Sequence, residues 1–156
     1  MKQVMILRSL KISNERILKI LADLGYEKIP NNMYEKLGMF IVDLAKDHMQ
    51  HKFEVDHLNP KDNKIMLSTT RTKIIKKIIN SVTYVLKEDE LIICIDKRVL
   101  HNLSLGKLIE DSEYGNSSTR PYPLFRNFCV YAEKHLKAII TQFIIEGRIF
   151  DGKSIK

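Results

Sequence analysis

The stretch VTYVLKEDELIICID, residues 82–96, decides the fold class that the sequence predicts. Two runs rich in β-branched and aromatic residues, 82–87 and 91–96, flank the polar segment EDE. This pattern is typical of a β-hairpin, because such side chains suit a pleated, half-buried surface and polar residues suit the turn. It is the clearest hairpin pattern in the chain. The predicted sheet is therefore small and antiparallel.

Two amphipathic helices are predicted before the hairpin. Ser13 suits the N-cap of the first, whose isoleucines and leucines recur at helical spacing until Gly25 ends it. Asn32, followed three residues later by Glu35, resembles a capping box at the start of the second. The second helix is expected to run to about His51. Residues 52–64 then indicate a polar loop with at most a short extended piece.

A third, basic helix is predicted from Thr69 to about Asn80, TTRTKIIKKIIN. Its isoleucines fall on one face and its cations largely elsewhere. Those cations could lie against the phosphates of DNA, which dominate nucleic-acid affinity. A solvated face on an amphipathic helix is the other interpretation, and both stay open. The candidate DNA-facing residues are Arg71, Lys73, Lys76 and Lys77.

Downstream of the hairpin, a short helix over about Leu103–Ile109 leads to EYGNSSTRPYP, residues 113–123. One long helix is expected after Pro123, ending near Glu146 with Gly147 in the C′ position. Residues 148–156 are predicted as a short strand or a tail. The predicted class is α+β, with a small antiparallel sheet covered by N-terminal helices and one long C-terminal helix.

One domain is expected for the 156 residues, with a helical half at about 13–80 and the hairpin, loop and long helix at about 82–146. No apolar run approaches the length of a membrane span, and the N-terminus lacks a signal-peptide pattern. Synthesis in the cytoplasm and no membrane contact are therefore expected. The net charge of +7 favours attraction to polyanions, although solubility alone also explains it.

The search for chemical sites gives no enzyme, metal or cofactor prediction. His48, His51, Asp56 and His57 are close in sequence, but their spacing matches no zinc signature. Common nucleophile, zinc-protease and phosphate-loop motifs do not occur. The two cysteines, Cys94 and Cys129, stand in apolar contexts and are interpreted as free, inert thiols.

The segment at 113–123 supplies the remaining functional prediction. Glu113, Tyr114, Gly115, Asn116 and Ser117 are followed by Pro121, Tyr122, Pro123, Phe125 and Arg126 at the start of the last helix. This order resembles the head–tail joining or tail-completion proteins of tailed bacteriophages, often described as minor tail or morphogenesis proteins. The resemblance covers about residues 82–140.

The resemblance implies a non-enzymatic structural protein of the virion that forms a ring in the neck. Such a ring of six or twelve copies would join portal or adaptor to tail proteins, close to packaged DNA. A glycine turn, a polar tip and two stiffening prolines suit an arm that reaches a neighbouring copy. The residues expected in subunit contacts are Glu113, Tyr114, Gly115, Asn116, Arg120, Pro121, Tyr122 and Pro123. The alternative is a small basic DNA-binding regulatory protein.

Overall fold

A three-stranded antiparallel sheet lies at the centre of the computed structural model, which describes residues 8–27, 32–58, 69–118 and 120–146. The strand order is β1 (Leu10–Ser13), β3 (Glu90–Ile95), β2 (Val82–Leu86). The predicted hairpin is confirmed: β2 pairs with β3 from Val82↔Ile95 to Leu86↔Leu91. The α+β class with a small antiparallel sheet is likewise confirmed.

The strand β1 was not predicted, and it joins the N-terminal part of the chain to the hairpin. Its four residues, LKIS, pair antiparallel with β3 from Leu10↔Ile93 to Ser13↔Glu90. Leu10 and Ile12 are buried, and the residues between and after them are exposed. Such a short alternation gives a weak sequence signal, because one period-two repeat also fits a loop.

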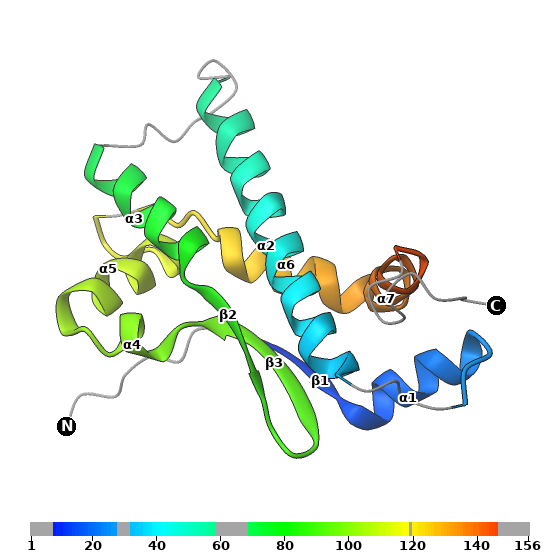
Figure 1. Cartoon of the computed structure of the whole chain (residues 1–156). Coiled ribbons are helices and arrows are strands. Elements are labelled where there is room, and N and C mark those ends of the chain that lie inside the picture. Colours follow the sequence, from blue (N-terminus) through cyan, green and yellow to red (C-terminus); the bar gives the residue numbers. More distant parts are fainter. Residues whose placement is uncertain (1–7, 28–31, 59–68, 119, 147–156) are drawn as a thin grey trace.

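Two helices lie next to this sheet in the N-terminal half. The helix α1 (Asn14–Asp23) starts as predicted, with the Ser13 hydroxyl accepting a hydrogen bond from the Arg16 N–H at 3.2 Å. Gly25, just past its end, has a φ of 93°, which glycine adopts easily. The long helix α2 (Met33–Leu58) crosses the sheet, and Gly38 allows a close approach to Tyr84 of β2 (Figure 1).

The predicted loop at 52–64 is wrong for residues 52–58, which continue α2. Phe53 explains the difference, because it lies four residues after the buried Met49 and extends the same buried stripe. A Lys52–Asp56 pair at 3.1 Å supports this last part of the helix. The turn-forming residues at 60, 62 and 63 lie outside the described residues.

The basic helix has the predicted bounds, α3 (Thr69–Asn80), and buries Ile75, Ile78 and Ile79. Beyond β3 come α4 (Lys97–Leu100), which was not predicted, and α5 (Leu103–Tyr114), which is longer than expected. The Asp96 and Asn102 side chains cap these two helices. Within the described ranges, no helix combines the length and apolar character needed to cross a membrane.

The single long C-terminal helix predicted from the sequence is wrong, because the chain bends at His135. The segment forms α6 (Leu124–Lys134) and α7 (Leu136–Ile145), and His135 between them has φ −113° and ψ 21°. The bend turns the second helix away from the first (Figure 1). Both helices still contact α2.

The predicted apolar stripe is nevertheless buried on both sides of the bend. Its members are Phe125, Phe128, Ala132, Leu136, Ile139, Ile140 and Phe143. Periodicity therefore identified the buried face correctly but not the change of axis, since a bend at one residue leaves the spacing of apolar residues unchanged. Gly147 and the last residues, 148–156, lie outside the described part of the chain.

Candidate functional site

The candidate site is the arm, residues 113–123, which connects the end of α5 to the start of α6. Gly115 follows α5 with a φ of 77°, as predicted for a glycine that reverses the chain. The Tyr122 N–H donates to the Ser112 carbonyl at 2.7 Å. This bond ties the two ends of the arm together, so the arm is a closed loop with a fixed base.

The buried side chain of Glu113 connects the base of the arm to the start of α6. This side chain is 1% exposed, and its carboxylate accepts hydrogen bonds from the Phe125 N–H at 3.1 Å and the Arg126 N–H at 2.9 Å. These donors belong to the first turn of α6, which has no intrahelical acceptors for them. Burial raises the pKa of Glu113, while the N–H donors and the Arg126 charge oppose the rise. Glu113 therefore caps α6 from a buried position, whereas the sequence placed it among the residues expected in subunit contacts.

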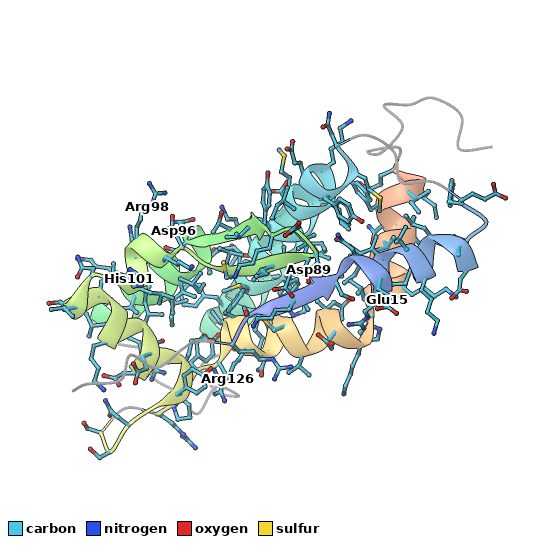
Figure 2. All side chains as sticks on the ribbon, turned by 90° about the horizontal axis from the view of Figure 1, so that it is seen from below. Glu15, Asp89, Asp96, Arg98, His101 and Arg126 are labelled. Atoms are coloured by element: carbon cyan, nitrogen blue, oxygen red, sulfur yellow. The ribbon has the colours of Figure 1, made fainter. Side chains whose placement is uncertain are left out.

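Arg126 and Tyr114 close the same side of the base. An Arg126 Nη donates to the Glu113 carbonyl at 2.6 Å, and the guanidinium lies 4.3 Å from the centre of the Tyr114 ring. The Tyr114 hydroxyl accepts a hydrogen bond from the Arg8 N–H at 3.1 Å. Figure 2 shows Arg126 beside the junction of the arm with α6. These contacts hold the Tyr114 side chain against its own subunit.

Tyr122, another residue expected in subunit contacts, also points inward. It is 6% exposed, and its hydroxyl donates to the Asp56 carboxylate on α2 at 2.7 Å. Burial is the largest cause that raises the pKa of Tyr122, and the hydrogen bond to Asp56 raises this pKa further. The hydroxyl therefore stays a donor across the physiological pH range. Pro123, at the N-cap position of α6, is half-buried.

Arg71 binds the backbone of the arm and does not lie on the exposed face of α3. Its guanidinium donates to the Ser112 carbonyl at 3.2 Å and to the Arg120 carbonyl. One side chain thus binds the backbone directly before the arm and again at its tip. The sequence grouped Arg71 with the candidate DNA-facing lysines, but its position four residues before the buried Ile75 places it toward the core.

The tip of the arm, defined as residues 116–118, 120 and 121, is exposed to solvent. The Asn116 side-chain oxygen accepts a hydrogen bond from the Ser118 N–H at 2.9 Å, an Asx turn that shapes the tip locally. Of the residues predicted for subunit contact, Asn116, Arg120 and Pro121 are exposed. The arm therefore combines a buried, hydrogen-bonded base with an exposed polar tip.

The lysines of α3 form a separate surface. Lys73, Lys76 and Lys77 are exposed on the face opposite the buried isoleucines. The structure thus separates the four candidate DNA-facing residues into one arm-holding arginine and three exposed lysines.

Both cysteines and His48 occupy packed or stacked positions. Cys94 and Cys129 are free thiols, and burial raises the pKa of both, that of Cys129 to about 12. His48 stacks on Tyr131 with ring centres 4.9 Å apart. Across the part of the chain that the structure describes, no three His, Cys, Asp or Glu side chains lie close enough to hold a metal ion. The side chain of His57 lies outside that part.

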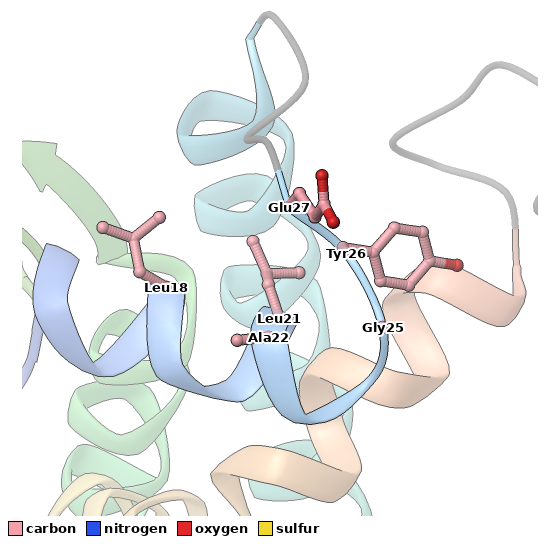
Figure 3. A pocket seen from close by; sticks show the side chains of 6 residues that line it. All are labelled: Leu18, Leu21, Ala22, Gly25, Tyr26 and Glu27. Carbon is pink, nitrogen blue, oxygen red and sulfur yellow. The ribbon is translucent and has the colours of Figure 1, made fainter.

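A hollow lies beside α1, away from the arm (Figure 3). Apolar side chains, with one carboxylate, line it: Leu18, Leu21, Ala22, Gly25, Tyr26 and Glu27. It lies at the opposite end of the molecule from α5 (Figure 1). A lining of this kind suits contact with protein better than contact with an anion.

Comparisons with protein-family models, with curated proteins and with solved structures found no match to this chain. The function must therefore be argued from the residues themselves. Sequence reasoning located the arm but missed Asp56, Ser112 and Arg71, which hold it. Asp56 and Arg71 are distant from the arm in sequence, and only the spacing of Arg71 from the isoleucines of α3 gave a signal for an inward position.

Proposed function

We propose that this protein is a structural subunit of a tailed bacteriophage and forms a ring of six or twelve copies in the neck. The observation that carries the proposal is the arm, whose sequence resembles that of head–tail joining proteins and whose tip is exposed on a fixed base. In the ring, the tip of each copy contacts the next copy. The ring joins portal or adaptor proteins to the tail and has no enzymatic role.

The contacts of the base support this role on physical grounds. A loop that is already ordered before association loses less conformational entropy on binding than a flexible one. Contacts with α6, α2 and α3 supply that order, through the bonds of Glu113, Tyr122 and Arg71 respectively. The motif residues of the arm therefore act mainly by holding its shape, and the tip supplies the contact.

A ring also requires each copy to present two different surfaces at a fixed angle. The arm follows α5 at one end of the molecule, and the hollow beside α1 lies at the other (Figure 1). Two dissimilar surfaces at opposite ends favour a head-to-tail arrangement of copies over a two-fold dimer.

The proposal is tested by placing a bulky charge on the tip. Ser117 is exposed, so we expect Ser117→Arg to fold normally. Because the new side chain obstructs the contact of the tip with the next copy, we expect at least a tenfold loss of particles with joined heads and tails. Ser104→Arg, at an exposed serine on α5, is the matched control and should assemble normally. Circular dichroism checks the fold, and electron microscopy of particles from the virus that carries the gene counts joined heads.

Two results would contradict the proposal. One is that purified particles lack the chain altogether. The other is that Ser117→Arg particles join as often as the control while the variant protein is present in them. Loss of folding in Ser117→Arg would be visible by circular dichroism, and Ser117→Lys then tests the same point with a more flexible side chain.

A further inference from the structure

The fold brings the end of α3 next to α4, although the two helices are separated in sequence by the whole hairpin. A polar hollow lies where they meet, lined by Lys77, Asn80 and Ser81 on one side and by Asp96, Arg98 and Asn102 on the other. The Asp96 N–H donates to the Ser81 carbonyl at 2.8 Å, which fixes the two sides relative to each other. The hollow is thus part of the folded framework.

Five exposed cations lie on the two helices that border this hollow, and two of them, Lys77 and Arg98, line it. We define the basic surface as Lys73, Lys76, Lys77, Lys97 and Arg98, all of them exposed. The helix α3 contains no acidic residue, and Asp96 is the only carboxylate among the residues that line the hollow. In Figure 2 the Arg98 side chain extends outward from the ribbon, with Asp96 and His101 nearby.

The polar groups between the cations fit an anionic polymer. Asn80, Ser81 and Asn102 line the hollow, and amide and hydroxyl groups of this kind commonly donate to phosphate oxygens. Lys76 and Lys77 follow Lys73 by three and four residues, so the three cations cluster within about one turn on the exposed side of α3. A cluster of lysines beside a polar hollow is suited to neighbouring phosphates.

We infer that the basic surface binds the phosphate backbone of duplex DNA without reading its sequence. The segments 69–81 and 96–102 contain no Phe, Tyr or Trp, so the surface lacks the aromatic platforms on which single strands stack. A backbone-only contact also requires no element in a groove. The inference goes beyond the ring function and does not depend on it.

Asp96 weakens this binding in the chain as it stands. Its carboxylate accepts from an Arg98 Nη at 2.9 Å and from the Arg98 N–H at 2.9 Å, and thus both caps α4 and engages the arginine. The hydrogen bonds from Arg98, helped by the charge of Lys77, lower the pKa of Asp96. Asp96 therefore stays negative at neutral pH and competes with phosphate for Arg98.

The test measures affinity for a fluorescent DNA duplex by anisotropy, between about 50 and about 200 mM salt. In Lys76→Gln/Lys77→Gln, we expect the slope of log affinity against log salt to become shallower by about 0.9 for each lysine removed. The matched control is Lys11→Gln/Lys19→Gln, which removes two exposed lysines from β1 and α1 and should keep the wild-type slope. Circular dichroism checks that each variant is folded.

A second variant acts in the opposite direction. Asp96→Asn keeps a good N-cap for α4 but removes the competing charge. We expect it to bind the same duplex about three- to tenfold more tightly than wild type at low salt, consistent with one added charge contact. A loss-of-function explanation such as misfolding cannot produce this gain.

Three outcomes would overturn the inference. The first is no binding at about 50 mM salt. The second is an equal change of slope in the control pair, which would assign the attraction to net charge alone. The third is tighter binding of single-stranded than of duplex DNA. Each leaves the ring proposal standing, while a chain that binds DNA as expected but never enters particles would contradict only the ring.

Discussion

At the scale of single residues, the motif side chains of the arm divide by exposure into those that hold it and those that face solvent. Glu113 and Tyr122 were expected in subunit contacts because the arm resembles the corresponding segment of phage neck proteins. The structure buries both and gives each a specific partner. Exposure depends on tertiary contacts with α2 and α6, and no local pattern reports these contacts.

Glu113→Gln should change how stability depends on pH. Because burial raises the pKa of Glu113, the folded chain binds this proton more tightly than the unfolded chain. The wild type therefore loses stability as pH rises from the ordinary glutamate pKa through the higher folded value, and the variant does not. We expect the unfolding free energy of wild type minus that of the variant to decrease from about pH 4 to about pH 7, measured by urea titration.

Glu15→Gln, at an exposed position on α1, controls for the loss of one negative charge. An increase of the wild-type advantage with pH would contradict the prediction for Glu113. It would mean that the two N–H donors and Arg126 stabilise the carboxylate more than burial disfavours it.

At the scale of elements, the sequence predicted those with a long, regular pattern and missed those set by one or two residues. The hairpin, α1 and α3 follow from alternation or helical spacing over several residues. The strand β1 is four residues long, and beyond His51 the buried stripe of α2 continues through one residue, Phe53. The bend at His135 changes a backbone angle without changing the pattern of apolar residues.

Gly38 shows how the packing of α2 on the sheet depends on one residue. A Cβ at this position would lie 2.7 Å from Tyr84 Cγ and 3.2 Å from Leu91 Cδ1. We expect Gly38→Ala to destabilise the protein by about 1–3 kcal/mol by overpacking, despite the better helix propensity of alanine, which is worth about 1 kcal/mol. Thermal and urea denaturation measure the change.

The same substitution in a Tyr84→Ala background tests the cause. Without the ring, the new methyl group has space, so Gly38→Ala should there be neutral or stabilising. Equal destabilisation in both backgrounds would place the cause in α2 itself rather than in its contact with β2.

At the scale of the whole molecule, the two halves of the sequence share one sheet and one core. The strand β1, from the N-terminal half, pairs with β3 of the hairpin, and α2 packs on β2 and on α6. The arm depends on the same arrangement, because Asp56 and Arg71 come from the N-terminal half and hold residues of the C-terminal half. These contacts favour one cooperative unit over two domains.

Separating the chain at residue 80 tests this cooperativity. Residues 1–80 lack the partner of β1, and residues 81–156 lack the helix that covers the hairpin, so each fragment exposes most of its apolar core side chains. We expect neither fragment to fold alone and an equimolar mixture to recover native near-ultraviolet circular dichroism from the tyrosines. Native dispersion of amide signals by nuclear magnetic resonance in either isolated fragment would contradict the single unit. In that case the arm base would form between two domains, and Tyr122→Phe, which removes the bond to Asp56, should weaken their association in the mixture.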